Sequence, residues 1–465
     1  MQKQLKPMTL ILTIGFVLVI LRNSTPSKSS SSDVILVPRD YAKIQQAIDR
    51  ANPGDTIEVA SGTYYEKLRI TKSIRLVGQG INQTVISENG TVVFVDAADN
   101  VEIRGLSVRA GTYGIFLSYC QNAMLRDNEM SDNRWNFGVW GTSVTEFIHN
   151  IDSSNKVDGK TLYYWTNRNG GQVPKDAGYV ALINSTGVIV KDATLTSNEQ
   201  GVLLVSTTNS IVENVTAYGN DEGIDSRWSS NNTITKSRFH SINWRAFYLD
   251  QSHNNSVYGN TVFNSKYGLL VQNSTGNTFY HNNIINNIDQ AYTDLSTNSW
   301  FNDELEEGNY WSDYAGEDHN GDGVGDTNTP WEGLDSFPLM ELRDFEPPRP
   351  IARLDNTAFK GQATIFNAGE SYDDAGISEF SWSFGDGATG NGREVSHSYA
   401  ETGEYTITLT VVDLAGKSSS DTLRVTVVEP PLALTWWILI LGLAAGGTLL
   451  ASLFFWKSRS TKKGK

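Results

Sequence analysis

The 465-residue sequence has little cysteine, histidine or positive charge, and each shortage excludes a class of protein. Its single cysteine, Cys120, cannot form an intramolecular disulfide framework or a cysteine-based zinc or iron–sulfur site. Because 37 Lys and Arg face 52 Asp and Glu, the net charge of −15 argues against nucleic acid as a partner. The 41 glycines, frequent Asn and 39% hydrophobic residues predict a turn-rich β protein with a packed core.

Long uncharged runs occur at the two ends of the chain. Residues 1–32 contain an apolar stretch behind two lysines and a Ser/Thr-rich linker, which predicts a signal peptide or a retained signal anchor. Residues 430–456 carry no charge and predict a transmembrane helix, and the basic residues 457–465 predict a cytoplasmic tail. The segment between the two runs is therefore expected at the cell surface.

Glycosylation sequons of the type Asn-x-Ser/Thr support export of this segment. The predicted acceptors are Asn82, Asn89, Asn184, Asn214, Asn231, Asn254 and Asn273.

A repeat of 22 to 23 residues organises the middle of the chain. Each unit has a small residue followed by a short apolar strand, as at Gly201, Gly223, Ala246 and Gly268. Asn residues recur with the same period, which suits a parallel β-helix whose stacked amides form hydrogen-bonded ladders. Leucine-rich repeats are the competing solenoid, but their leucine consensus is absent.

The repeat is expected to form one column of equivalent positions with a cap at its start. Residues 41–51 have the pattern of a short amphipathic helix that would plug the first coil. An earlier repeat pair, Gly114 and Gly138, is 24 residues apart, and residues 153–177 are expected to leave the coil as an excursion.

The stretch Pro53-Gly-Asp-Thr-Ile-Glu-Val resembles the start of β-helix proteins of the pectin-lyase-like superfamily. Two further stretches resemble its NosD-like branch: Val157-Asp-Gly-Lys-Thr-Leu-Tyr-Tyr-Trp and Gly308-Asn-Tyr-Trp-Ser-Asp-Tyr. The resemblance implies a right-handed single-stranded parallel β-helix over residues 33–345. The family name is associated with copper, but the six His of this chain have no close metal-ligand spacing, so no copper site is expected.

A different pattern follows the Pro-rich break after residue 345. Apolar and polar residues alternate over 351–428, which is typical of antiparallel strands with one buried face. The motifs Trp382-Ser-Phe-Gly-Asp-Gly and Gly403-Glu-Tyr-Thr-Ile-Thr-Leu-Thr-Val resemble the PKD domain. The resemblance implies an immunoglobulin-like β-sandwich over 346–429, with Trp382 in its core, so the whole chain is expected to be all-β apart from its termini.

Alignment of the coils predicts a functional patch on the outward face. Asp225, Arg227 and Asp250 occupy outward positions of neighbouring coils, and paired carboxylates beside an arginine would suit a polysaccharide lyase, glycoside hydrolase or epimerase. The alternative is that Arg227 and Asp250 form a solvated ion pair of a scaffold. The aromatic rings expected to stack on sugars are Trp140, Trp228, Trp244 and Tyr248.

These features favour a membrane-anchored surface protein that binds polysaccharide or envelope glycan, or mediates adhesion. A carbohydrate-active enzyme is the alternative, since no complete active-site motif is present, and pure envelope scaffolding is the third hypothesis. Glycan and membrane are the expected partners.

A calcium loop is predicted near the end of the repeat region. Oxygen ligands stand at relative positions 1, 3, 5, 7 and 9, but position 12 is Thr329 instead of Glu, so the loop is not an EF-hand. An Asx-turn cap without metal is the alternative. The predicted ligands of a structural Ca²⁺ are Asp318, Asn320, Asp322, Val324 and Asp326.

Overall fold

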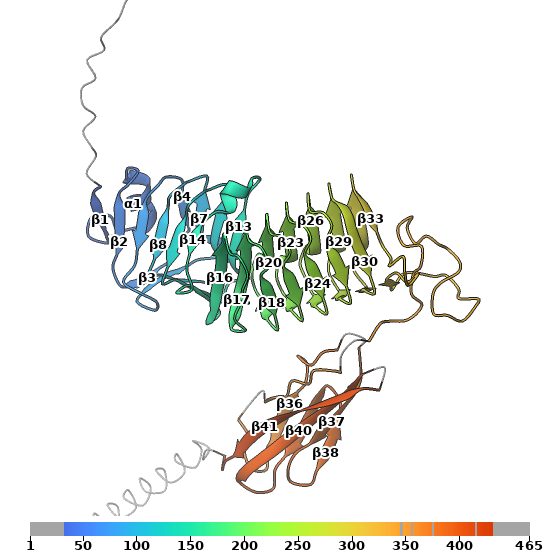
Figure 1. Ribbon diagram of the computed structural model, residues 1–465. Coiled ribbons are helices and arrows are strands. Elements are labelled where there is room, and N and C mark those ends of the chain that lie inside the picture. The colour runs from blue at the N-terminus through green and yellow to red at the C-terminus, as the bar shows by residue number, and fades with distance from the viewer. Residues whose placement is uncertain (1–31, 345–346, 355–356, 374–375, 414–415, 431–465) are drawn as a thin grey trace, which may run out of the picture.

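The computed structural model describes residues 32–344, 347–354, 357–373, 376–413 and 416–430. They form a long stack of β-coils and a smaller β-sandwich beneath its C-terminal half (Figure 1). Apart from residues 32 and 430, the predicted signal segment, transmembrane helix and basic tail lie outside these ranges. Within the described part of the chain, no helix is long and apolar enough to cross a membrane.

The first stack of coils, residues 34–157, passes through three parallel sheets. Sheet A consists of β1 (Val34–Val37), β2 (Thr56–Val59), β5 (Arg75–Val77), β8 (Glu102–Arg104), β11 (Met124–Arg126) and β14 (Asn150–Ile151). Sheet B begins with β3 (Gly62–Tyr64), β6 (Thr84–Ser87), β9 (Ser107–Arg109), β12 (Glu129–Ser131) and β15 (Lys156–Val157). Sheet C, on the third side, consists of β4 (Leu68–Ile70), β7 (Thr91–Asp96), β10 (Tyr113–Ser118) and β13 (Trp135–Trp140).

The second stack, residues 160–311, continues sheet B and adds two new sheets. Sheet B continues with β16 (Lys160–Thr166), β17 (Ala177–Ile183), β20 (Gln200–Val205), β23 (Glu222–Arg227), β26 (Arg245–Asp250), β29 (Tyr267–Gln272) and β32 (Asp289–Asp294). Sheet D consists of β18 (Ile189–Lys191), β21 (Ile211–Glu213), β24 (Thr233–Thr235), β27 (Ser256–Tyr258), β30 (Thr275–Tyr280) and β33 (Thr297–Ser299). Sheet E consists of β19 (Thr194–Thr196), β22 (Thr216–Tyr218), β25 (Arg238–His240), β28 (Thr261–Phe263), β31 (Asn283–Ile285) and β34 (Tyr310–Trp311).

The predicted column of equivalent side chains is confirmed in the second stack. Successive coils place one buried apolar residue directly above the next: Val202, Ile224, Phe247 and Leu269. A small residue is the second residue of each of these strands, and at Gly223 it is a steric requirement, because a Cβ there would lie 2.3 Å from the carbonyl oxygen of Ala246. The parallel β-helix therefore follows from the repeat.

The predicted register is wrong in the first stack. Ile115 pairs with Phe137 and not with Val139, so this coil is shorter by two residues than the 24-residue spacing of Gly114 and Gly138 predicts. These strands belong to sheet C, whereas the second-stack column belongs to sheet B. The single column expected across both stacks does not exist, because the long strand of each coil changes sides between them.

The predicted excursion contains the junction between the stacks. There β15 pairs antiparallel with β16, and β16 pairs parallel with β17, so sheet B is unbroken. Beyond this point the outer face of sheet B meets the last strand of sheet C. The Glu199 N–H donates to the Phe137 carbonyl at 2.9 Å, and Gln200 Nε2 donates to the Val139 carbonyl at 3.1 Å. Strands β17 and β20 consequently bury both faces, one in each of two hydrophobic cores.

Buried amide ladders run along the second stack, as predicted. The Asn232 N–H donates to Asn255 Oδ1 at 2.9 Å, and the Asn255 N–H donates to Asn277 Oδ1 at 2.8 Å. Asn209 and Asn254 were expected in this ladder but lie one position earlier, at turn residues with φ of 51° and 55°. The ladder supplies partners for backbone groups that the turns would otherwise bury unpaired.

A short helix, α1 (Ile44–Arg50), covers the first coil, as predicted from residues 41–51. Its buried residues include Ile44 and Ile48, and the Glu66 carboxylate accepts the N–H of Ile44 at 3.0 Å. This bond satisfies one of the donors that a helix start leaves free.

The C-terminal β-sandwich has two antiparallel sheets. Its strands are β35 (Arg353–Leu354), β36 (Ala363–Asn367) and β39 (Glu394–Ser398) in one sheet, and β38 (Thr389–Asn391), β37 (Ile377–Ser383), β40 (Gly403–Asp413) and β41 (Ser418–Val427) in the other. Trp382 lies in the core, as predicted. The sandwich contacts sheet E, where the Arg238 guanidinium lies 4.4 Å from the ring centre of Phe263 and 5.1 Å from that of Tyr372.

Candidate functional site

Buried charged side chains gather where the outer face of sheet B meets the end of sheet C. They come from three successive coils of the second stack and lie within or directly before β20, β23 and β26. We call this group the junction cluster; its members are Glu199, Asp221, Glu222, Asp225, Arg227 and Arg245, and none is more than 8% exposed.

Asp225 and Arg227 lie together as predicted, but they are buried instead of forming a surface patch. Arg227 Nε donates to both carboxylate oxygens of Asp225, at 2.9 and 3.0 Å, and the side chains of the two residues are 6% and 0% exposed, respectively. Asp250 lies opposite Arg227 in the register, yet it accepts a hydrogen bond from Asn273 Nδ2 at 3.0 Å. The expected Arg227–Asp250 surface pair is thus replaced by a buried pair within one strand, because β13 covers this face.

Three of the four predicted aromatic residues form a stack with two arginines. The Arg227 guanidinium lies 4.2 Å from the ring centre of Trp140 and 5.3 Å from that of Tyr248. The Arg245 guanidinium lies 3.6 Å from the Tyr248 ring centre and 3.9 Å from that of Trp244. Rings and guanidinium groups therefore alternate, an arrangement that stabilises desolvated cations. The fourth predicted residue, Trp228, packs at the edge of this group against Phe147, with ring centres 6.3 Å apart.

Four members of the junction cluster were missed from the sequence: Glu199, Asp221, Glu222 and Arg245. Arg245 forms a buried ion pair with Glu222 on the preceding coil. Asp221 accepts a hydrogen bond from Asn243 Nδ2 at 2.6 Å. A signal was available, because in each coil these residues directly precede the small residue that starts the strand: Glu199-Gln200 before Gly201, Asp221-Glu222 before Gly223, and Trp244-Arg245 before Ala246.

Burial shifts the protonation equilibria of these carboxyl groups. Desolvation, followed by repulsion from Asp221, raises the pKa of Glu199 to about 8. Desolvation also raises the pKa of Asp221 and of Asp225, although the Arg227 charge opposes the rise at Asp225. Burial lowers the pKa of Arg245 to about 10. Glu199 therefore holds its proton more strongly than an exposed glutamate does, and in its protonated form it can donate a hydrogen bond.

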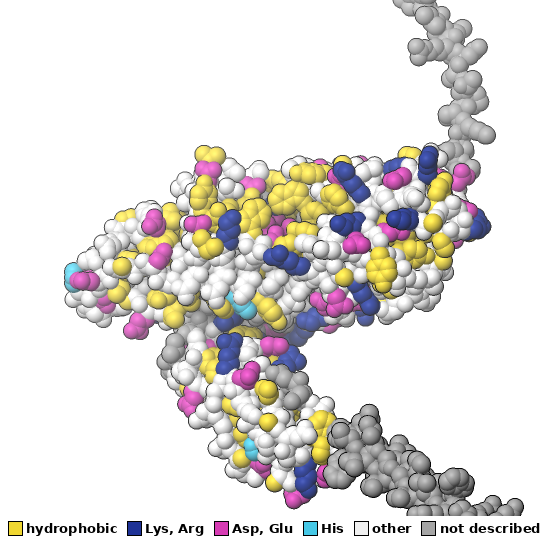
Figure 2. Space-filling model, turned by 180° about the vertical axis from the view of Figure 1, so that it is seen from behind, with side chains coloured by type: hydrophobic (Ala, Val, Ile, Leu, Met, Phe, Trp, Pro, Cys, Tyr) yellow, Lys and Arg dark blue, Asp and Glu magenta, His cyan; other side chains and the backbone are white. Residues whose placement is uncertain are grey.

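An aromatic strip on the outer face of sheet C leads to the junction cluster. We define it by Phe94, Tyr113, Phe116 and Trp135, whose neighbouring ring centres lie 4.9 to 5.9 Å apart. The strip reaches Glu199, because a Cβ on Gly138 would lie 2.5 Å from the Glu199 Cβ and 2.9 Å from the Phe116 ring. The space-filling view in Figure 2 shows hydrophobic side chains gathered along the upper part of the β-helix, with charged side chains among them.

Carboxylates of the predicted calcium loop accept hydrogen bonds from backbone N–H groups of the same loop. Asp318 accepts the N–H groups of Gly321 and Gly323 at 2.6 and 2.9 Å, and these bonds lower the pKa of its carboxyl. Asp322 accepts the Val324 N–H at 2.9 Å. These are the Asx turns of the alternative hypothesis, and they orient the carboxylates along one loop.

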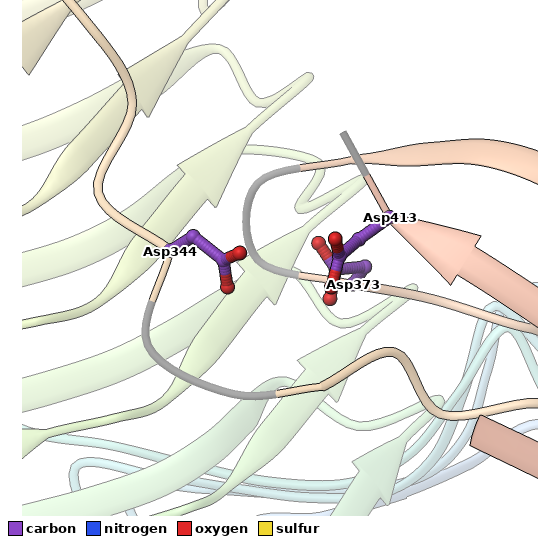
Figure 3. Close-up of side chains that lie close together, drawn as sticks. All are labelled: Asp344, Asp373 and Asp413. Carbon is purple, nitrogen blue, oxygen red and sulfur yellow. The ribbon is translucent and has the colours of Figure 1, made fainter. Parts of the chain in front are cut away.

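A second group of carboxylates lies where the β-helix leads into the sandwich. Ligand oxygens of Asp344, Asp373 and Asp413 lie within 4.8 Å of one another. Figure 3 shows the Asp344 carboxylate pointing toward the other two. Lys417 Nζ donates to Asp344 at 2.9 Å. The sequence carries no pattern that marks this group, because its members are separated by turns and strands of two domains.

The predicted glycosylation acceptors lie mostly at exposed turns. Six of the seven are exposed, and Asn214 is half-buried and accepts a hydrogen bond from Arg349 Nη2 at 2.6 Å. Six of the seven also have φ between 48° and 63°, which Asn tolerates better than most residues. Backbone geometry therefore accounts for Asn at these positions independently of any sugar.

Two family models match the regions described above. Residues 48–169 and 148–316 match the family described as periplasmic copper-binding protein (NosD), which is more than half of the chain, and residues 346–427 match the PKD domain. The chain belongs to the NosD family. In this NosD-family protein the β-helix precedes a PKD domain.

Curated relatives match short parts of the NosD-family chain. Collagenase ColA of Clostridium perfringens is 29% identical over 100 residues, 21% of this chain and 9% of the collagenase. Collagenase ColA of Bacillus cereus is 42% identical over 55 residues, 12% of this chain and 6% of the collagenase. The chain thus spans less than a tenth of the length of either relative.

Solved structures resemble each domain of the NosD-family chain separately. The A-module of the mannuronan C-5 epimerase AlgE6 of Azotobacter vinelandii is 18% identical with a TM-score of 0.27, and the match covers 56% of this chain and 76% of the module. The PKD1 domain of Vibrio anguillarum Epp is 27% identical with a TM-score of 0.17, and the match covers 19% of this chain and all of that domain.

The description of the NosD family names copper, so we asked whether residues of this chain could form a copper site. Among the described residues, only Asp344, Asp373 and Asp413 form a group of three or more His, Cys or carboxylate ligands. Carboxylate oxygens suit calcium or magnesium, whereas copper prefers imidazole and sulfur. Burial lowers the pKa of His149 and of His240 to about 4, but neither His belongs to a group of ligands. The described residues do not fit a copper centre.

Proposed function

We propose that this protein binds polysaccharide along the aromatic strip and at the junction cluster. The observation that carries the proposal is the continuity of the aromatic strip, three of whose four rings are partly exposed, with buried, oriented charges at one end. Ring faces pack against the apolar CH faces of sugars, and convergent polar groups fix the orientation of a ligand. Such a combination is unusual on a scaffold, because buried charges cost stability unless they serve another purpose.

A glycan array probed with the full-length chain in detergent tests this proposal. We expect binding to at least one glycan class, weakened about five- to thirtyfold by Tyr113→Ala, because loss of a stacking ring removes about 1 to 2 kcal/mol. Tyr65→Ala is the matched control, since Tyr65 is 74% exposed and lies outside the strip. Absence of binding to every glycan, or equal loss in both variants, would reject the site.

Catalysis at the same site is the second candidate, favoured by one observation. Glu199 holds its proton near neutral pH while Asp221 lies close enough to repel it, and such a pair can serve as acid and base in lyase, hydrolase or epimerase chemistry. Asp225, 0% exposed, would position Arg227 and not touch the sugar. Product formation that Glu199→Gln and Asp221→Asn both abolish would establish an enzyme; glycan binding without product would leave a binding protein.

We further propose that the described domains are displayed outside the cell. The support is the sequence of residues 1–32 as a signal and of residues 430–456 as a membrane anchor. Protease added to intact cells should then degrade the PKD domain but spare an epitope placed after residue 465. Protection of both parts would contradict this display.

Structural calcium is proposed for the C-terminal half of the protein. The Asp318 loop offers oxygen ligands on a short loop, and Asp344, Asp373 and Asp413 offer three carboxylates in one place. Calcium at either place would fix the end of the β-helix relative to the PKD domain.

A further inference from the structure

The charges of the junction cluster indicate which kind of polysaccharide fits the site. We propose that the site selects a glycan that carries free amino groups, such as a hexosamine polymer, over a polyuronate. This inference rests on the proposed function, because it names the ligand of the same site.

Carboxyl groups outnumber guanidinium groups around the site. Arg134 at the rim lies 4.3 Å from the Trp135 ring centre and donates to Asn243 Oδ1, and it joins Arg227 and Arg245 as the third cation. The carboxyl groups are Glu199, Asp221, Glu222, Asp225 and Asp250. Even with one of them protonated, the site keeps an excess of negative charge, which attracts an ammonium group and repels a carboxylate.

The ion pairs of the cluster engage both guanidinium groups and leave Glu199 outside either pair. Asp225 already pairs with Arg227, and Glu222 with Arg245. Glu199 is 4% exposed, and its Oε2 atom has no hydrogen-bond partner among the described residues. A buried polar atom without a partner costs about 1 to 3 kcal/mol, so an ammonium that reached Glu199 would recover that loss once the carboxyl released its proton.

The two buried guanidinium groups are poorly placed for a uronate. Each lies between two aromatic rings in the stack of Trp140, Arg227, Tyr248, Arg245 and Trp244. Arg227 Nη2 and Arg245 Nε lack hydrogen-bond partners, but both atoms are buried beneath these rings. A uronate would have to displace a ring and add a charge to an already negative site, whereas an amino sugar offsets that charge.

The negative charge continues along sheet B beyond the cluster. In the register, Asp250, Gln272 and Asp294 follow one another on successive coils, at a spacing of about 4.8 Å. Lys266 is the basic residue of this stretch, and it lies 5.3 Å from the Tyr267 ring centre. An extended polymer with repeated amino groups could therefore meet carboxylates at more than one coil.

The test compares three oligosaccharides of equal length on the full-length chain in detergent: β-1,4-linked glucosamine, its N-acetylated form, and oligomannuronate. We expect the free amine to bind at least tenfold more tightly than either of the others. Asp221→Asn should weaken amine binding at least fivefold, while Asp127→Asn, an exposed turn residue with φ of 53°, should leave it unchanged.

Proton release provides a second readout. An ammonium beside Glu199 favours the ionised carboxyl, so calorimetry at pH 7 in buffers of different ionisation enthalpy should show proton release that Glu199→Gln abolishes. Tighter binding of oligomannuronate or of the N-acetylated form would overturn the inference and leave the proposed function intact. Failure of glycans of every class to bind would overturn both.

Discussion

The second stack and the junction are built from the same coils but are stabilised in different ways. Along the stack, uncharged amides such as Asn255 and Asn277 repeat in register and satisfy one another. At the junction, two buried ion pairs and a protonated carboxyl take their place. Repetition thus provides a scaffold of paired amides, and buried charges gather where the two stacks meet.

The largest effect should come from interrupting a ladder. Asn277 is fully buried, and its side chain accepts from Asn255 and donates to the Ser252 carbonyl at 2.9 Å and to Asn298 Oδ1 at 2.8 Å. Asn277→Ala should lower the free energy of unfolding by about 3 to 5 kcal/mol, because several buried groups lose partners. Chemical denaturation measures the loss.

The matched control for this ladder variant is Asn89→Ala, an exposed position, which should change the free energy of unfolding by less than about 0.5 kcal/mol. Equal effects in the two variants would show that the ladder does not stabilise the stack.

A smaller loss in the free energy of unfolding is expected when an ion pair of the junction cluster is broken. Arg227→Ala leaves the Asp225 carboxylate buried without its partner and should cost about 3 kcal/mol. The double variant Asp225→Leu, Arg227→Met should cost less than the single one, because no uncompensated charge remains. If the double variant is the less stable of the two, the buried pair itself stabilises the fold.

Stability at the junction should depend on pH, unlike that of the ladder. The pKa of Glu199 is raised from its ordinary value of 4.5 to about 8, so the folded state binds its proton more tightly than the unfolded state does. The stabilisation is complete below about pH 4.5 and is lost as the pH rises to about 8. Melting temperatures at pH 5 and 8 should therefore differ less in Glu199→Gln than in the natural sequence, and an identical difference would exclude Glu199 as the cause.

Calcium should have the smallest effect on the stability of the protein. At ten times its dissociation constant, calcium should add about 1.4 kcal/mol to the stability of the part that binds it. The melting temperature of the full-length chain would rise with calcium and fall with chelator. Asp413→Asn and Asp318→Asn assign the effect to the three-carboxylate group or to the loop, and a response retained in both variants would exclude both places.

The scaffold could be predicted from the sequence, whereas the burial of the site could not. The regular spacing between Gly201, Gly223 and Gly268 predicts that equivalent residues of successive coils stack in one column. Strands that recur at a constant spacing bury their apolar sides only when they stack. The covering of Asp225 depends on β13, which is about 90 residues earlier in the chain and out of phase with the second stack. Contacts of that kind leave no periodic signal, and so outward positions were expected to be exposed.

Because sheet B continues without a break through twelve strands, the β-helix is a series of similar coils. Whole coils downstream of β29 could be duplicated or deleted without altering the contacts of Glu199 or Arg227. Each such event would change the length by about 4.8 Å. Homologous proteins could thus differ in the length of the β-helix while keeping the junction cluster unchanged.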